Sequence, residues 1–405
     1  MTRLTRHHTH AAEAAGRVAL RGGAEAWHPV RKNGRRLAAL LVAVVLASTV
    51  VVLTALSLPG IRVDVWLPHA GGTGPLGLAL SGDWRTVGTR ARLFRQLFDI
   101  HYDAVVHGIE SQQPASQTND VSGSSRGAVD VDFDAREVAA SRVADATATL
   151  ERIMFPWLRG AASLDMLLAT RGRGIVIAAG SKHALAAKLT VLAIRATGSH
   201  IPVQIAYAGP RDLGETEHDM LASLAGVAML DMLDPFDLRN VVGLRGSGFK
   251  AFAAVASTFR EVAVIDAGTV FLQPPEVLFE MRDFRSTGAM LFRDFAQANN
   301  SLNATAGVRG ILSDFAAPFE GRLLLNDSRV VLGEATGEMD DGVIVWDKLR
   351  VLPAMLVACE MSRTLQGSKV QSPARSDSDS AWLAHEATRI PFGVAPGFDG
   401  AVGSA

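Results

Sequence analysis

The stretch Glu261–Pro275, which reads EVAVIDAGTVFLQPP, constrains the fold of this chain more than any other. Within it, Val262–Ile265 is a short, wholly apolar run rich in β-branched residues, which is the pattern of a strand buried on both faces of a parallel sheet. The run ends at Asp266, and Ala267 and Gly268 then turn the chain. In open α/β sheets, ligands bind beyond the carboxyl ends of the strands. The sequence therefore predicts a central strand with an acidic residue at its ligand-binding tip.

Strand and helix patterns alternate on both sides of this stretch. We expect further strands over 175–178, 201–207, 227–230, 288–292 and 342–346, and helices over 182–195, 214–224 and 250–260. Repeated βαβ units predict an α/β fold with a mostly parallel sheet and helices on both faces. An aspartate at a strand end is also a common turn residue. Position alone therefore leaves Asp266 open between a turn role and a cation-binding role.

An uncharged run near the amino terminus, Leu37–Leu58, directly follows a cluster of basic residues. Its length of about 22 residues is enough to cross a bilayer core as a helix, and the positive-inside rule keeps the basic side cytosolic. We therefore expect a cytosolic tail over 1–36 and a type II transmembrane anchor over 37–58. A cleaved signal peptide is the alternative. Beyond the anchor, the sequence predicts a partly disordered stem over 59–134, a helical lead-in over 135–170 and a catalytic domain over 171–405.

Composition excludes several classes of function. The chain has 405 residues and a formal net charge of −1, so it has no general basic surface and we expect no nucleic-acid partner. Cys359 is the only cysteine. An intrachain disulfide and a cysteine-based zinc site are therefore excluded.

Several segments resemble the fungal Golgi α-mannosyltransferases that extend mannan and glycoprotein outer chains. FLQPPE, from Phe271 to Glu276, matches the end of the DADAVFLQPPE stretch of that family. Asp266 matches the first acidic position of the family's DxD metal motif, and Gly268 stands at the second. IPVQIAYAGPRDL resembles the family's PIEIVYAGDEDL, and GSGFKAFAAVASTF resembles its GGWAIKPFAALASSF. The resemblance covers about residues 150–400, and family members usually continue beyond the point matched by Ala405, which predicts a truncated carboxyl terminus.

The resemblance implies a fold, a reaction and a location. The fold is the GT-A type, and the reaction transfers mannose from GDP-mannose to a mannose hydroxyl of a glycoprotein or mannan glycan, with retention at the anomeric carbon. The location is the Golgi membrane, with the catalytic domain in the lumen. The cofactor is a divalent cation, Mn2+, held by Asp266. Gly268 at the second acidic position weakens the binding of this cation.

The residue roles that the resemblance implies form three groups. They are donor binding by Lys250, Asp266 and Gln273, acceptor binding by Asp340 and Asp341, and catalysis by the carboxylates of Asp377 and Asp379. Each type of residue also has a plainer explanation, as an exposed lysine, a charged turn or a helix N-cap. Gly268 favours a second hypothesis, a catalytically silent glycan-binding or scaffold protein on the same fold. A transferase that uses another sugar nucleotide is the third, because the fold does not fix the donor.

Overall fold

The computed structural model describes residues 84–110, 130–158, 163–237, 249–294, 302–316, 328–335, 338–367 and 376–398. All of them belong to one compact unit that spans residues 62–405. The predicted tail and anchor, 1–36 and 37–58, lie outside the described residues. Within the described ranges, no helix combines the length and the apolar character that a membrane span requires.

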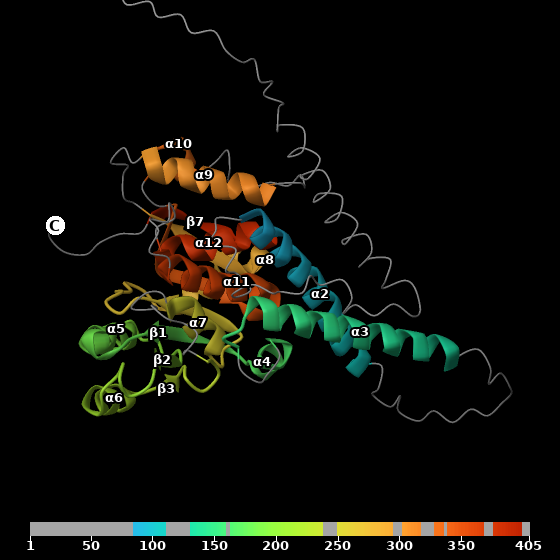
Figure 1. Ribbon diagram of the computed structural model, residues 1–405. Coiled ribbons are helices and arrows are strands. Elements are labelled where there is room, and N and C mark those ends of the chain that lie inside the picture. The colour runs from blue at the N-terminus through green and yellow to red at the C-terminus, as the bar shows by residue number, and fades with distance from the viewer. Residues whose placement is uncertain are drawn as a thin grey trace, which may run out of the picture. The chain divides into compact units, whose positions relative to one another are not determined.

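A seven-stranded sheet, in the order β3-β2-β1-β4-β6-β5-β7, forms the centre of this unit. Figure 1 labels its neighbouring strands β1, β2 and β3. Its strands are β1 Arg173–Ala178, β2 Val203–Tyr207, β3 Val227–Asp231, β4 Glu261–Ile265, β5 Ala289–Arg293, β6 Met339–Asp347 and β7 Gly393–Phe398. Strands β1 to β4 pair in parallel, and β7 is parallel to β5. Of the seven, only β6 runs against its neighbours. The predicted mostly parallel sheet is therefore confirmed, with β7 as a strand that the sequence did not indicate.

Two hydrophobic layers cover the two faces of the sheet. Because side chains alternate along a strand, Ile175 and Ile177 of β1 enter one layer and Val176 enters the other. The first layer includes residues of α5 Ala184–Ala196, α6 Glu215–Ala222, the 3-10 helix η6 Pro275–Glu280 and α8 Arg282–Thr287. The second includes residues of α4 Ser163–Ala169, α7 Lys250–Ala256, α9 Leu302–Ala316, α10 Arg329–Leu332, α11 Lys348–Gly367 and α12 Ser376–Thr388. The prediction that helices cover both faces of the sheet is therefore confirmed.

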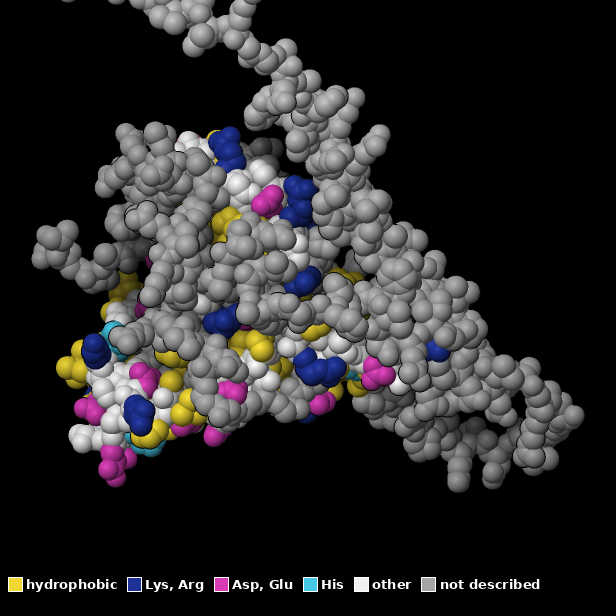
Figure 2. Space-filling model, in the orientation of Figure 1, with side chains coloured by type: hydrophobic (Ala, Val, Ile, Leu, Met, Phe, Trp, Pro, Cys, Tyr) yellow, Lys and Arg dark blue, Asp and Glu magenta, His cyan; other side chains and the backbone are white. Residues whose placement is uncertain are grey.

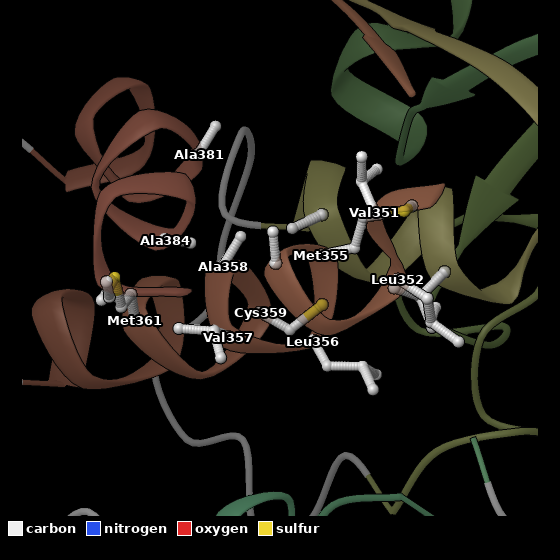
Figure 3. Packing of buried hydrophobic residues seen from close by; sticks show 14 of the residues in the cluster. Val351, Leu352, Met355, Leu356, Val357, Ala358, Cys359, Met361, Ala381 and Ala384 are labelled. Atoms are coloured by element: carbon white, nitrogen blue, oxygen red, sulfur yellow. The ribbon is translucent and has the colours of Figure 1, made fainter. Parts of the chain in front are cut away.

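The two helices α11 and α12 contact each other within the second layer (Figures 1 and 3). Figure 3 labels the buried residues that fill this region, among them Met355, Cys359 and Ala384. Every residue from Val351 to Ser362 is buried. A helix that is apolar on nearly all sides belongs in the interior of a domain, and α11 accordingly lies at the centre of this layer.

The predicted stem differs from the structure over α2, Trp84–Glu110. Val87, Phe94 and Phe98 are buried in the second hydrophobic layer. The Phe94 ring meets that of Phe155 edge-on, with 5.1 Å between centroids. Frequent arginines lower the average hydropathy of this segment and hide its apolar stripe. This part of the predicted stem is thus packed in the core, together with the lead-in helix α3, Asp130–Met154.

The visible surface of the described residues carries both signs of charge, with hydrophobic side chains between them (Figure 2). Some of the exposed hydrophobic side chains belong to α5, where Leu185, Leu189 and Leu192 lie on its outer side. Their spacing of four and three residues places them on one face of the helix. The opposite face of α5, with Val191 and Ile194, is buried against the sheet.

His385 of α12 is held in the core by two hydrogen bonds. The Trp346 indole N–H donates to Nε2 over 3.1 Å, and Nδ1 lies 3.0 Å from the Ile390 carbonyl oxygen. The first contact needs an unprotonated Nε2, so the ring is neutral with its proton on Nδ1. Burial lowers the pKa of His385 from 6.5 to about 4.

We expect His385 to make the free energy of unfolding depend on pH. Its folded pKa of about 4 lies below the unfolded value of 6.5, so the unfolded chain binds more protons between these values. The stabilisation is fully present above pH 6.5 and is lost as the pH falls through about 4, by roughly 3 kcal/mol. Denaturant titrations of the wild type and of His385→Gln measure it. The stability gap between the two proteins should shrink over this window, and a constant gap would contradict the prediction.

Candidate active site

The carboxyl edge of the sheet gathers the charged residues that end its strands. Asp231 ends β3, Asp266 follows β4, and Asp340 lies near the start of β6, which is antiparallel to β4. Burial raises the pKa of the Tyr207 hydroxyl at the end of β2, and the nearby carboxylates of Asp231 and Asp234 raise it further. The central strand thus ends in an acidic residue at a polar edge, as the sequence predicts.

Asp266 forms an ion pair with Lys250 at the tip of β4. Lys250 Nζ lies 2.6 Å from Asp266 Oδ1. The lysine side chain is only 5% exposed, whereas the aspartate side chain is 47% exposed. The backbone also fixes Asp266, because its N–H donates to the Gly342 carbonyl oxygen over 2.9 Å. Two residues that the sequence assigns to donor binding are therefore in contact, with the ammonium buried and the carboxylate half open to solvent.

The chain turns directly after Asp266 through Gly268. The Thr269 N–H donates to the Asp266 carbonyl oxygen over 3.1 Å, and Gly268 has a φ of +106°. The Gly268 N–H donates to the hydroxyl of Thr190, a buried residue of α5, over 2.8 Å. A positive φ at the third residue of a four-residue turn strongly favours glycine. The glycine that stands at the second acidic position is therefore the residue that this backbone conformation favours.

Restoring a carboxylate by Gly268→Asp should destabilise the protein. No atom lies within 4 Å of a Cβ built at Gly268, so the cost is one of backbone strain rather than of a clash. We expect the free energy of unfolding to fall by about 1–2 kcal/mol. Gly310→Ala is a matched control, because Gly310 lies in α9 with open space around its Cβ and no positive φ. Denaturant unfolding should rank the aspartate variant well below this control, and equal stabilities would refute the strained turn.

Lys348, the first residue of α11, holds the helix that carries Lys250. Its ammonium donates to the carbonyl oxygens of Val255 and Ser257, at the carboxyl end of α7. Lys250 is the first residue of that helix. Burial lowers the pKa of Lys348 to about 7. Lys348 thus satisfies carbonyl groups that a helix end leaves without partners and holds the helix that carries Lys250.

The predicted acceptor residues lie next to this tip. Asp340 Oδ1 accepts the Gly342 N–H over 2.7 Å, and Gly342 in turn binds the backbone of Asp266. The pairing of β5 and β6 shifts register beside Asp340, which is where strands re-aim side chains next to sites. The side chain of Asp341 lies outside the described residues. The structure therefore brings Asp340 close to Asp266 through one intervening residue.

Gln273 is exposed on a segment that leads away from the tip. Three residues later, Glu276 accepts a hydrogen bond from Ser199, which precedes β2. Glu280 pairs with Arg173, the first residue of β1. Both contacts lie at the amino edge of the sheet. Gln273 is thus not among the residues that the structure gathers around Asp266.

Asp379 lies in the first turn of α12 and is buried, at 3% exposure. Its Oδ1 accepts the Trp382 indole N–H over 3.0 Å. The neighbouring Ser380 accepts a hydrogen bond from Ser362, near the end of α11, over 2.8 Å. The side chain of Asp377 lies outside the described residues. The catalytic roles of Asp377 and Asp379 stay predictions, and the contact to Trp382 gives Asp379 a structural role as well.

The described residues do not complete a divalent metal site. Manganese and magnesium ions are held by several oxygen ligands at once. Here Asp266 is engaged by Lys250, Asp340 by a backbone amide, and Gly268 offers no side chain. Among the described residues, no group of three or more His, Cys, Asp or Glu side chains is arranged to hold a metal ion. The Mn2+ site at Asp266 stays a prediction that the described donor atoms do not support.

An open, mostly parallel sheet with an ion pair at the tip of its central strand places this chain among the α/β proteins, a class that binds ligands beyond the carboxyl ends of its strands. The family model described as "Mannosyltransferase putative" matches residues 172–405, a range that includes all seven strands of the sheet. The chain belongs to this mannosyltransferase family.

Curated relatives match a shorter part of the chain. Alpha-1,2-mannosyltransferase MNN2 of Saccharomyces cerevisiae is 30% identical over 129 residues, which cover 31% of this chain and 21% of that protein. Alpha-1,2-mannosyltransferase MNN22 of Candida albicans is 28% identical over 126 residues, covering 30% and 21%. The chain thus spans about a fifth of the length of these relatives.

Among solved structures, the chain is similar to the galactosyltransferase LgtC in complex with donor and acceptor sugar analogs. The TM-score is 0.34 and the sequence identity 15%, over 55% of this chain and 72% of that one. A likeness at this level supports no conclusion about the site.

Proposed function

We propose that this protein is a glycosyltransferase of the GT-A type that transfers mannose from GDP-mannose to a mannose hydroxyl of a glycan. The observation that carries the proposal is the Lys250–Asp266 ion pair at the carboxyl tip of the central strand. The match of residues 172–405 to a mannosyltransferase family supports the sugar and the reaction class.

The chemistry requires a site that stabilises a leaving diphosphate. The bond between the anomeric carbon of mannose and the β-phosphate oxygen breaks, and a bond to the acceptor oxygen forms at that carbon. GDP leaves with the electron pair of the broken bond, and its β-phosphate oxygen takes up the proton that the acceptor hydroxyl releases. A positive charge fixed beside the diphosphate favours this transition state. Lys250 is a suitable group, because its ammonium is held in place by Asp266.

The remaining parts of the proposal rest on the resemblance in sequence. They are retention at the anomeric carbon, acceptor binding by Asp340 and Asp341, and support of the developing positive charge on the sugar by Asp377 or Asp379. They also include a Golgi location with the 37–58 segment as membrane anchor and a lumenal catalytic domain. Asp340 lies close to the Asp266 tip, which agrees with an acceptor role beside the donor.

A catalytically silent glycan-binding or scaffold protein is the second candidate. The observation that favours it is Gly268, whose φ of +106° disfavours a carboxylate at the second acidic position. Such a protein would bind a mannose-terminated glycan without turning over GDP-mannose.

A transfer assay separates these candidates and tests the donor. The full chain is incubated with a mannose-terminated oligosaccharide and with GDP-mannose, and in parallel with UDP- and CMP-sugars. We expect a product one mannose longer from GDP-mannose alone. Product from a UDP- or CMP-sugar would identify another transferase, and glycan binding without any product would favour the silent protein.

A further inference from the structure

We propose that the donor site works without a divalent metal, with the buried ammonium of Lys250 as the cation that receives the diphosphate. This inference rests on the proposed function and specifies how its donor is held. It follows from three features of the β4 tip: a glycine at the turn, two described carboxylates that each have a partner on one oxygen, and a lysine fixed in the core.

The first feature is the turn at Gly268. Its positive φ and its N–H bond to Thr190 set a backbone conformation that L side chains rarely adopt. The backbone therefore disfavours a carboxylate at position 268 itself.

The second feature is the engagement of two described carboxylates at the tip, each through one of its oxygens. Asp266 Oδ1 contacts the Lys250 ammonium at 2.6 Å, and Asp340 Oδ1 accepts a backbone N–H at 2.7 Å. A divalent ion at Asp266 would lie close to the ammonium, and like charges in a partly buried site repel strongly. The tip of β4 therefore favours the Lys250 ammonium alone over the ammonium together with a divalent metal ion.

The third feature is how firmly Lys250 is held. A lysine on a surface is mobile, but here the residue is 4% exposed and the following residues of α7, Ala251 to Val255, are buried. Lys348 binds the other end of the same helix. An ammonium fixed in this way loses little freedom when an anion binds, and low local polarity strengthens the contact.

The ion pair also fits the two kinds of group in a sugar nucleotide. An ammonium has three N–H donors, so it can bind a carboxylate oxygen and a phosphate oxygen together. An ionised carboxylate only accepts hydrogen bonds, and the half-exposed carboxylate of Asp266 suits the hydroxyl groups of a sugar or ribose. The pair thus matches a diphosphate beside a polyhydroxyl group.

Calorimetry of GDP-mannose binding to the full chain tests the inference, first in EDTA and then with Mn2+. We expect dissociation constants within about threefold of each other. Binding at least about tenfold tighter with Mn2+, a difference of one decade in affinity, would overturn the inference and leave the proposed function standing. No binding under either condition, with the protein shown to be folded, would overturn both.

Substitution of Lys250 tests whether its ammonium is the cation that binds the diphosphate. Lys250→Met should weaken GDP binding in EDTA by about tenfold or more, as expected for loss of a charge-assisted hydrogen bond. Guanosine, which lacks the diphosphate, should bind this variant and the wild type alike, a result that general misfolding would not give. Lys188→Met, which removes a charge from α5, is the control and should leave both affinities unchanged. Equal losses for GDP and guanosine, or full GDP affinity in Lys250→Met, would overturn the role of Lys250.

Discussion

Asp266→Asn should lower the rate of mannose transfer from GDP-mannose by about a hundredfold or more. The substitution keeps the size of the side chain but removes the charge that holds the Lys250 ammonium at 2.6 Å. Loss of one well-placed electrostatic group at a reacting centre commonly costs this much in rate. Initial rates at saturating and at limiting GDP-mannose, for wild type and variant, measure the effect.

A neutralised carboxylate elsewhere provides the control. Asp219 on α6 is 75% exposed in its side chain and lies outside the candidate site. Asp219→Asn should transfer mannose at the wild-type rate. If Asp266→Asn retained more than about a tenth of wild-type activity, the contribution of Asp266 would be smaller than an electrostatic role at the reacting centre predicts.

The largest loss of stability is expected for Trp157→Ala. The Trp157 ring is fully buried and packs against Phe252 of α7 at 4.7 Å and Phe236 at 5.2 Å between centroids. Its indole N–H also donates to Glu360 over 2.8 Å. Removing so large a buried side chain leaves a cavity, and the free energy of unfolding should fall by about 3–5 kcal/mol. Denaturant unfolding followed by circular dichroism measures this change.

Trp157→Phe separates packing from hydrogen bonding. It keeps an aromatic ring beside Phe252 but removes the N–H donor to Glu360, whose carboxylate keeps its contact with Arg363. We expect a loss of about 1–2 kcal/mol. Equal losses in the alanine and phenylalanine variants would contradict a role dominated by packing.

The strands around the site could be predicted from the sequence because their signals are local. The apolar run Val262–Ile265 has a strand on each side in the sheet, so almost nothing polar interrupts it. The opposite case is β7, which contains Pro396 and Gly397. It pairs with β5 at the end of the strand order, where proline is tolerated, and its composition does not suggest a strand.

The helix α2 lies within the predicted stem, and its core contacts are distant in sequence. Arg92 donates to the Phe315 carbonyl oxygen, and Arg95 donates to that of Arg389. These arginines bind the carbonyl groups of other segments, while Phe94 between them enters the core. The sequence shows only a charged segment. It does not show which distant segments supply the carbonyl groups that these arginines bind.

At the candidate site, the sequence identified residue types but not their contacts. The likeness around GSGFKAFAAVASTF pointed to Lys250, and the strand pattern pointed to Asp266. That the two form an ion pair depends on how α7 packs on the sheet, a long-range feature. The positive φ of Gly268 is likewise a property of the folded turn. Neither could be read from composition or periodicity.

A crystal structure of the full chain with GDP-mannose would test most directly whether the carboxyl edge of the sheet is the donor site. We expect a phosphate oxygen within hydrogen-bond distance of Lys250 Nζ, about 2.7–3.1 Å, and the sugar beside Asp266 and Asp340. A diphosphate bound elsewhere on the protein, with the Lys250–Asp266 pair untouched, would contradict the assignment of this edge as the site of mannose transfer.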